Sequence, residues 1–445
     1  MNQTHELDRS ISYRALIRFS LPTIASMIFM SIYSSVDGIF VARLVSTDAL
    51  SAVNLIMPLI MLSMAVGMMV GSGGNALIAK LIGEGKAQEA RRIFSLLIVV
   101  VFMTSVLLSV LGLIFINPLL RFLGADASLL PLCTDYAVPV LLLMPLSTFG
   151  MMFQMSFITV GKPTLGFIVS VAGGVTNIIL DYLFIAVFQM GITGAAIATG
   201  IGYSVPSLVG LIYFTFSRNG SLYIVKPKLD FTAIGKSCSN GVSEMVTSLS
   251  GSVTALLINN TLMRLAGSNG VASFTVIMYT QGLLASIYMG YSVGVAPLIS
   301  YNFGKQDTGR LKKIYTSSLK MIAVTSIATL TLSLFLTNML VGIFIPTGTE
   351  IFDMAVYGYR IVAIGFLFMG FNGFSSAMFT ALNNGKVSAI LSFFRTFGFV
   401  VVTVLAFSAL FGMNGLWFAS PIAEFLAICM TVYYFKKMRP VYKYA

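Results

Sequence analysis

The chain has 445 residues, of which 57% are hydrophobic and only 9% are charged, and its mean hydropathy is +0.93. Soluble domains typically carry about 25% charged residues, so this composition excludes an ordinary soluble globule. Apolar stretches of roughly 20 residues predict membrane-spanning helices, since a helix of that length crosses a bilayer core about 30 Å thick. The alternating pattern of a transmembrane barrel strand is not found. We therefore expect an all-α membrane protein.

Rare residue types narrow the chemistry. His5 is the only histidine, and Cys133, Cys238 and Cys429 form no CxxC pair. Zinc sites, disulfide frameworks and His-based catalytic triads are therefore not supported. An intramembrane enzyme would need a histidine-metal site, a GxGD aspartyl pair or a serine activated by a base, and we identify none. We expect neither an enzymatic activity nor a cofactor.

Twelve membrane-spanning helices are predicted in chain order. The polar N-terminal segment lacks a small-residue cleavage site, so we expect the first span to be an uncleaved helix and not a signal peptide. The predicted spans are 15–40, 49–73, 93–116, 133–156, 165–188, 194–216, 239–263, 270–298, 317–338, 352–379, 387–409 and 415–435.

The basic residues indicate which side of the membrane each loop occupies. Of the 27 Lys and Arg residues, 21 lie in the N-terminal segment, the even-numbered loops and the C-terminal segment, and only three lie in odd-numbered loops. The positive-inside rule then places both termini in the cytoplasm of a multi-pass cell (inner) membrane protein. This topology, together with contact to anionic membrane lipids, accounts for the net charge of +12. Nucleic acid is not needed as a partner.

The second half of the sequence repeats features of the first. Arg43-Leu44 recurs as Arg264-Leu265, and Gly191, Gly194 and Ala198 recur as Gly412, Gly415 and Ala419, both at a shift of 221 residues, while Gly161-Lys162 recurs as Gly385-Lys386 at a shift of 224. We therefore expect an N-lobe at 1–216, a cytoplasmic linker at 217–238 and a C-lobe at 239–445. Six spans in each lobe predict a pseudo-two-fold axis along the membrane normal and a cavity between the lobes, an arrangement that suits alternating access.

Carboxylates inside predicted spans are costly, so each is a functional hypothesis. Asn177 precedes Asp181 by four residues, which places both side chains on one face of the fifth span. Their oxygens suit Na⁺, and the carboxylate is equally able to carry H⁺. Asp37, 15 residues beyond Pro22 in the first span, is the expected second carboxylate, and Pro22 is the expected hinge. The alternative is a pair of interhelical hydrogen bonds with a purely structural role.

Two more acidic residues fall within spans. Glu244 lies near the start of the seventh span, where it either faces the cavity and attracts cations or sits at the cytoplasmic interface near Lys236. Glu424 and Arg395 are expected to form a structural ion pair between the twelfth and eleventh spans. 

Two Gly-x-x-x-Gly pairs occupy corresponding positions in the repeat. The pair Gly67 and Gly71 lies in the second span, and the pair Gly290 and Gly294 lies in the eighth. Small residues at this spacing allow close helix packing, so we expect a packing role for both pairs.

Three segments together carry a family resemblance that covers nearly the whole chain. They are LPTIASMIFMSIYSSVDGIFVARL at 21–44, NIILDYLFIAVFQMGITGAAIAT at 177–199 and PLISYNFGKQD at 297–307. The chain resembles the multidrug and toxic compound extrusion (MATE) transporters. The resemblance implies twelve helices in two six-helix lobes and efflux of amphipathic, often cationic drugs in exchange for Na⁺ or H⁺.

The resemblance also implies site residues. It matches the N-lobe cation ligands to Asp37, Asn177, Asp181 and Thr199, a possible Na⁺ site, with Tyr136 as an aromatic polar neighbour.

The substrate cavity is assigned to three residues, Glu244, Gln281 and Asn372. Another branch of the family uses a C-lobe carboxylate pair. Here Glu244 lies earlier than the first carboxylate of that pair, and Asn372 stands near the position of the second. We therefore do not expect a C-lobe coupling site.

The sequence thus predicts a monomeric, cation-coupled antiporter of small-molecule drugs, surrounded by membrane lipids. Loading the N-lobe site is expected to bend or straighten the first helix at Pro22. The alternative is a lipid-linked precursor flippase of the same superfamily, which would need several basic residues facing the cavity. Only Lys320, Arg360 and Arg395 fall within predicted spans.

Overall fold

The computed structural model of the chain describes residues 6–8, 11–218 and 220–445, and the side chains of residues 6, 34–44, 47 and 50 lie outside what it describes. The regular structure of this part of the chain is helical. In chain order the elements are η1 (Glu6–Asp8), α1 (Tyr13–Leu44), α2 (Thr47–Gly83), α3 (Ala87–Ile114), α4 (Ile116–Phe122), α5 (Leu130–Thr159), α6 (Pro163–Asp181), η2 (Tyr182–Val187), α7 (Gly191–Phe216), α8 (Phe231–Gly304), α9 (Thr308–Gly342), α10 (Glu350–Val362), η3 (Ala363–Gly365), α11 (Phe366–Ala381), α12 (Gly385–Phe393), η4 (Phe394–Gly398) and α13 (Phe399–Tyr442).

Ten helical segments of the described chain are long and apolar enough to cross a membrane. Two of them far exceed the roughly 20 residues that one crossing needs: α8 has 74 residues, and the segment Gly385–Tyr442 has 58. Each contains a glycine at which the helix is interrupted. Gly267 has φ 60° and ψ −151°, and Gly412 has φ 59° and ψ −135°. Glycine adopts such backbone angles without steric cost, so each segment consists of two helices joined at a glycine.

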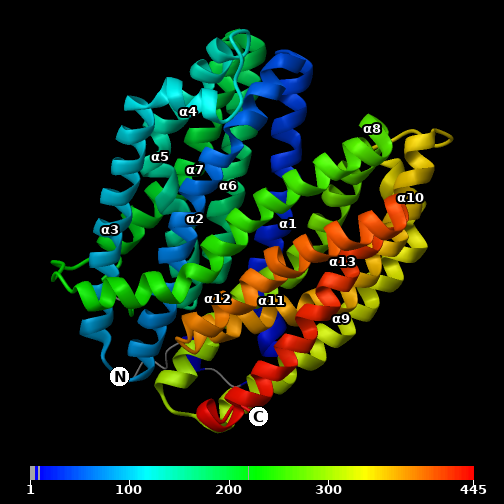
Figure 1. Cartoon of the computed structure of the whole chain (residues 1–445). Coiled ribbons are helices and arrows are strands. Elements are labelled where there is room, and N and C mark those ends of the chain that lie inside the picture. Colours follow the sequence, from blue (N-terminus) through cyan, green and yellow to red (C-terminus); the bar gives the residue numbers. More distant parts are fainter. Residues whose placement is uncertain (1–5, 9–10, 219) are drawn as a thin grey trace.

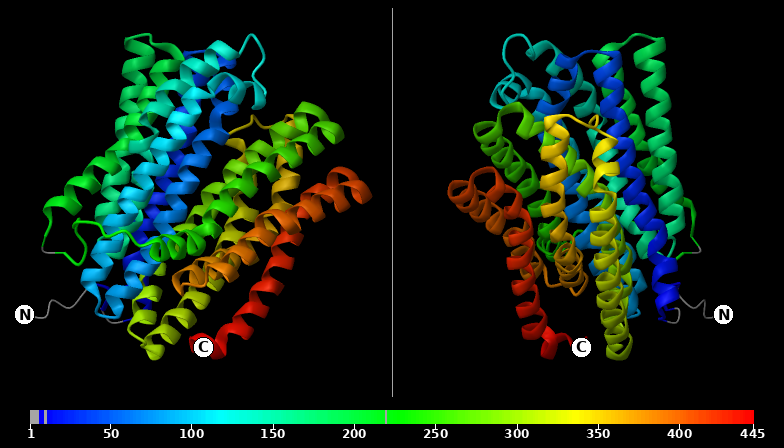
Figure 2. Two further views of the ribbon diagram at one scale, coloured as in Figure 1. Left: turned by 60° about the vertical axis from the view of Figure 1, so that its left-hand side comes forward. Right: turned by 90° about the vertical axis from the view of Figure 1, so that its right-hand side faces the viewer.

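The helices gather into two bundles (Figure 1). Helices α1–α7 form the first bundle, α9–α13 belong to the second, and α8 extends from the base of the first into the second. The bundles meet at the end where α1 begins and α13 ends, and they diverge toward α4 and α10 (Figures 1 and 2). We call the first of these ends the base of the molecule.

Backbone-to-backbone contact joins the bundles at the base. A Cβ atom added to Gly241 of α8 would lie 1.8 Å from the carbonyl oxygen of Met69 in α2, and one added to Gly73 would lie 2.1 Å from the carbonyl oxygen of Ser237. Neither contact leaves room for a side chain. Glycine at these positions lets α2 and α8 touch along their main chains.

The two Gly-x-x-x-Gly pairs have the packing role that the sequence predicts. A Cβ atom on Gly67 would lie 2.8 Å from the carbonyl oxygen of Thr148 in α5, and one on Gly290 of α8 would lie 2.5 Å from the Cα atom of Ile24 in α1. The pair in α2 therefore packs α2 against α5 within the first bundle, whereas the pair in α8 packs α8 against α1.

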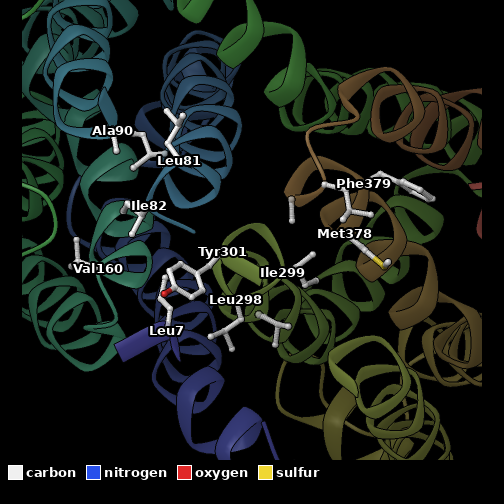
Figure 3. Close-up of a cluster of buried hydrophobic side chains, with 14 of the residues drawn as sticks. Leu7, Leu81, Ile82, Ala90, Val160, Leu298, Ile299, Tyr301, Met378 and Phe379 are labelled. Atoms are coloured by element: carbon white, nitrogen blue, oxygen red, sulfur yellow. The ribbon is translucent and has the colours of Figure 1, made fainter. Parts of the chain in front are cut away.

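A hydrophobic cluster fills the base and draws on both bundles (Figure 3). Leu81 and Ile82 of α2 belong to it, as do Leu298 of α8 and Phe379 of α11. Leu7, only 1% exposed, is buried in the same cluster. The short N-terminal element η1 is thus anchored between the two bundles.

Residues with positive φ recur at a nearly constant interval. The pairs are Gly85 and Gln306, Gly124 and Gly348, Gly161 and Asn383, and Gly191 and Gly412, which are separated by 221, 224, 222 and 221 residues. Each marks a helix end, a loop or an interruption, so the two halves of the chain turn at matching places.

The glycine contact at the base can be tested by adding one methyl group. Gly241→Ala should destabilise the protein by about 1–3 kcal/mol, because the new Cβ atom overlaps the main chain of α2. Gly251→Ala is the matched control, since it lies on the same helix with nothing within 4 Å of the added atom. It should be neutral, or stabilising by up to about 1 kcal/mol through helix propensity. Thermal unfolding of the purified variants measures both, and equal effects would refute the contact.

Candidate functional site

The most deeply buried acidic side chain of the first bundle lies at the C-terminal end of α6. Asp181 is 0% exposed, and Asn177, one turn earlier on the same face, is 1% exposed. A charged or amide group at this depth needs partners inside the protein, because lipid offers none. The two residues predicted to share a helix face therefore do so in the interior of the bundle.

Close packing of α6 on α7 positions Asn177. A Cβ atom added to Gly202 of α7 would lie 2.6 Å from the Cβ atom of Asn177, and one on Gly173 would lie 2.7 Å from the carbonyl oxygen of Gly202. Thr199 precedes Gly202 by three residues on α7. It lines a cavity of about 30 Å³ together with Ser147 and Tyr203.

Polar atoms around this point lack hydrogen bonds with other described residues. Both the Oδ1 and the Nδ2 atoms of Asn177 have no partner, and the Oγ1 atom of Thr199 has none. Among the buried asparagines whose side chains are described, Asn177 is the one with both amide atoms unpaired. Each such atom costs about 1–3 kcal/mol when buried. Of these atoms, the Oδ1 of Asn177 and the Oγ1 of Thr199 are of the type that ligates hard cations.

The helix changes its hydrogen-bonding pattern directly after Asp181. Residues Tyr182–Val187 form the π-helix η2, and the amide of Phe188 donates to the carbonyl of Leu183, five residues back. Isolated π-helical turns are frequent at functional sites. A second π-helix, η4, follows α12 and contains Arg395.

Helix α1 lies against this part of α6. A Cβ atom on Gly174 would lie 2.5 Å from the ring of Phe29 and 3.3 Å from the ring of Tyr33. Helix α1 also contacts η2. The predicted second carboxylate, Asp37, belongs to α1, and its side chain lies outside the described part of the structure.

The predicted aromatic neighbour lies close to the same region. Tyr136 of α5 is 1% exposed and packs in a cluster with Ile185 of η2 and Ile192 of α7. The structure adds two tyrosines that sequence reasoning missed. The rings of Tyr33 and Tyr203 meet edge to face with centroids 6.2 Å apart. Helical spacing is the signal that would have found them, because they lie four residues from Asp37 and Thr199.

Pro22, the predicted hinge, lies within α1. The hydroxyl of Ser26 donates to the carbonyl oxygen of Pro22 at 2.9 Å. Ser20 and Ile24, on either side of Pro22, contact Gly294 and Gly290 of α8. The proline therefore sits where α1 touches the second bundle.

In the second bundle, the buried polar groups around Glu424 are paired with one another. Arg395 Nε donates to Glu424 Oε1 at 3.1 Å, which is the predicted ion pair. Asn372 Nδ2 donates to Glu424 Oε2 at 2.7 Å, and Thr431 Oγ1 donates to Asn372 Oδ1 at 3.0 Å. This network uses the amide and carboxylate oxygens that a cation would otherwise bind.

The three predicted substrate-cavity residues do not come together. Asn372 belongs to the network above. Gln281 lines a cavity of about 210 Å³ within the second bundle. Glu244 lines a cavity of about 30 Å³ at the base, between α2 and α5 of the first bundle and α8 and α11 of the second. Of the three, only Glu244 lies between the bundles.

The donor set in the first bundle combines one carboxylate, one amide and one hydroxyl. No group of three or more His, Cys, Asp or Glu side chains that would hold a metal ion occurs among the residues described. Neutral oxygens with a single described carboxylate suit a monovalent hard cation better than a transition metal.

The sequence of the chain is similar to those of known proteins over most of its length. The family model described as MatE matches residues 22–183 and 245–405. The multidrug export protein MepA of Staphylococcus aureus (strain MRSA252) is 26% identical over 428 residues, covering 95% of this chain and 93% of that protein.

Solved structures agree with this match. A crystal structure of MATE in complex with MaL6 superimposes with a TM-score of 0.94 at 23% identity, and the outward-facing conformation of a multidrug resistance MATE family transporter of the MOP superfamily does so with 0.93 at 22%. Both comparisons cover 100% of each chain.

The polar network of the second bundle can be tested by a double-mutant cycle. Glu424→Leu should cost about 3–5 kcal/mol, because it leaves the Arg395 cation buried without its partner. Adding Arg395→Met should recover part of this loss. Chemical unfolding of the purified variants measures the coupling. Asp135→Leu, at an exposed acidic residue of α5, is the control and should change stability by less than about 0.5 kcal/mol. A double variant no more stable than Glu424→Leu would refute the pairing.

Proposed function

The chain belongs to the MatE family, and on that premise we propose that it is an antiporter that exports amphipathic, often cationic small molecules in exchange for Na⁺ or H⁺. It is a membrane transporter and not an enzyme. The name of the MepA relative supports multidrug export. We place the protein in the cell membrane as a monomer with both termini in the cytoplasm, following the distribution of its basic residues.

One observation carries the coupling proposal. The two bundles treat their buried polar groups differently: the amide of Asn372 is fully paired, whereas the amide of Asn177 makes no hydrogen bond with a described residue. Asn177 lies one turn before Asp181 on α6, and Thr199 lies one turn before Gly202, the residue of α7 that packs on Asn177. The first bundle therefore holds the coupling site, and the network of the second is structural.

Coupling requires that the loaded and empty sites prefer different shapes of the transporter. Asp37 and Asp181 would supply the negative charge, and Asn177 and Thr199 would supply neutral oxygens for Na⁺. Protonation of a carboxylate would neutralise the same charge. Either event changes how α1 packs on α6, and Pro22 lets the two ends of α1 move separately because the ring removes one backbone hydrogen bond.

The proposed architecture has twelve spans in two lobes related by a pseudo-two-fold axis. Two of the ten apolar segments count as two helices each, because α8 is interrupted at Gly267 and the segment Gly385–Tyr442 is interrupted at Gly412. The total is then twelve helices. The family model matches the chain in two segments of similar length. The recurring positive φ values, at intervals of 221 to 224 residues, support the repeat independently.

Alternating access is supported by the arrangement of the two bundles, which touch at the base and diverge toward the other end (Figure 1). The base is closed by glycine contacts, by the cluster around Leu7 and by ion pairs that cross between the lobes. Asp8 accepts hydrogen bonds from Lys305, at 2.8 Å, and from Arg310. The fold matches a structure described as outward-facing. This conformation therefore corresponds to one in which the cytoplasmic side is shut.

The position of Glu244 between the lobes supports a cationic substrate. Among the described residues that line the small cavity there, Glu244 is the charged one, and Ser72, Asn75 and Met155 are neutral. A lone carboxylate attracts cations and repels anions. A lipid-linked precursor flippase would need basic residues there to hold a pyrophosphate, so this alternative is not favoured.

Neutralising either carboxylate should abolish export. Asp181→Asn and Asp37→Asn keep the side-chain shape but remove the charge that binds Na⁺ or carries H⁺. We expect dye efflux from proteoliposomes to fall at least tenfold with an imposed Na⁺ or pH gradient, each tested separately. Whichever gradient drives the wild type identifies the coupling ion. Asp135→Asn, an exposed acid of α5, is the matched control and should transport normally. Normal efflux by Asp181→Asn would overturn the proposed site.

The ion pairs at Asp8 predict a second, conformational effect. Asp8→Asn should raise the labelling rate of a cysteine introduced at Ala296, between the lobes, about two- to tenfold, since each exposed ion pair contributes about 0.2–1 kcal/mol. Glu84→Gln, which removes ion pairs within the first lobe at the same end, is the control.

The effect of Asp8→Asn on the labelling rate should depend on pH in a direction that follows from the pKa of Asp8. The hydrogen bond from Lys305 and the charges of Lys305 and Arg310 hold the pKa of Asp8 below its ordinary value, against the opposing effect of burial. The ion pairs therefore contribute fully above about pH 4. They are lost as the pH falls through the lowered pKa. The ratio of variant to wild-type labelling rates should stay constant from about pH 5 to pH 8, and a ratio that varies there would contradict the assignment.

A further inference from the structure

A cleft at the base of the molecule is separate from the proposed coupling site. It has a volume of about 710 Å³ and is formed by the first turns of α1, the turn before α6 and one residue of α8. This volume falls within the ~300–1,000 Å³ typical of small-molecule sites. Neither the proposed export cycle nor the cation site uses it.

The described charged residues that line the cleft are all basic. Arg14, Arg18 and Lys162 line it, and no described acidic residue does. Arg14 and Arg18 are four residues apart on α1, so they share one face. Neither arginine makes an ion pair with a described residue, in contrast to Lys305 and Arg310 at the same end of the molecule.

The start of α6 adds donors to the same cleft. Lys162 is the N-cap of α6, and Pro163 and Thr164 form its first turn and line the cleft. Pro163 has no backbone N–H, and the N–H of Leu165 donates to the carbonyl oxygen of Lys162, so the helix terminus offers the N–H of Thr164 as its donor for an anion. The ammonium of Lys162 also lies 5.1 Å from the ring centre of Tyr213, which holds the lysine side chain at the helix terminus. 

The remaining walls are apolar and continue onto the outer surface. Phe19, Leu165 and Leu298 line the cleft. Just beyond it on α1 and α6, Ile17 is 45% exposed and Ile168 is 56% exposed. A charged pocket that opens onto an exposed apolar strip matches a ligand with an anionic head and a hydrocarbon tail. A free inorganic anion would have no use for the strip.

We propose that this cleft binds the phosphate of an anionic phospholipid of the cytoplasmic leaflet, with the two arginines and Lys162 around the head group and the acyl chains along Ile17 and Ile168. Basic pockets between membrane helices on the cytoplasmic side bind such head groups. The inference rests on membrane embedding and on the cytoplasmic placement of the base, and it does not depend on what the protein exports.

The test compares lipid binding by three forms of the full chain. The site variant carries Arg14→Gln, Arg18→Gln and Lys162→Gln. The control variant carries Lys226→Gln, Lys228→Gln and Lys236→Gln, which removes the same charge from exposed residues at the base outside the cleft. Native mass spectrometry in detergent titrates each with phosphatidylglycerol and with phosphatidylcholine of the same chains.

The wild type should bind phosphatidylglycerol preferentially. Affinity should fall roughly a hundredfold in the site variant, since each basic residue near an anionic surface contributes about a factor of five. The control variant should stay within about threefold of the wild type. Equal losses in both variants would overturn the proposal in favour of general charge attraction, and so would equal binding of the two lipids.

A second variant tests the cleft even if the triple site variant fails to fold. Thr164→Asp places a carboxylate in the first turn of α6, where the helix dipole favours it, so the protein should unfold at or above the wild-type temperature. It should nevertheless lose phosphatidylglycerol binding, because the carboxylate repels the phosphate. Unchanged binding would refute the site. Inorganic phosphate that displaces the lipid at equal concentration would assign the cleft to a free anion instead.

Discussion

A polar group at lipid depth must find its partner inside the protein, and the rest of this structure depends on how that requirement is met. The second lobe meets it by pairing Arg395, Glu424 and Asn372 with one another. The first lobe leaves Asn177 and Thr199 without described partners, although close packing of α6 on α7 holds Asn177 in place. Since unsatisfied groups cost free energy, the two unpaired amide atoms of Asn177 are the observation on which the proposed coupling site rests. The same comparison is the reason for proposing a structural role for Glu424.

The second constraint concerns how two helix bundles stay together in a membrane. Lipid is as apolar as leucine, so burial alone does not drive the bundles into contact, and close main-chain packing must do so. Gly73 and Gly241 provide it at the base, where α2 and α8 touch. The short element η1 adds two more contacts. Asp8 forms a partly exposed ion pair with Lys305, and Leu7 is buried in the hydrophobic cluster at the base. The base is therefore held by several separate contacts, and the alternating access that we propose would require them to break reversibly.

The sequence predicted the features that follow from helical periodicity and from the cost of charge in lipid. The shared face of Asn177 and Asp181, the Arg395–Glu424 pair and the packing glycines are of this kind. Other features depend on tertiary contact. Helix α2 continues to Gly83, ten residues beyond its predicted span, because hydropathy reports the thickness of the bilayer and not the end of a helix. The π-helix after Asp181 has no signal in composition. The ion pairs of Asp8 join residues about 300 positions apart, and nothing local marks them.

Helix α1 connects these separate regions. Its first turns carry the arginines of the basic cleft, its middle contacts the second lobe through Ser20 and Ile24 on either side of Pro22, and its far part packs on α6 through Phe29 and Tyr33. A change in packing at the cation site therefore reaches the contact between the lobes through one continuous element with a built-in break. Coupling free energy is reciprocal. If cation binding weakens the contact of α1 with Gly290 and Gly294, then whatever strengthens that contact must weaken cation binding by the same factor. Under the proposed coupling, the position of Pro22 between the two contacting residues would make the interface between the bundles, and not the cation site alone, a determinant of ion affinity.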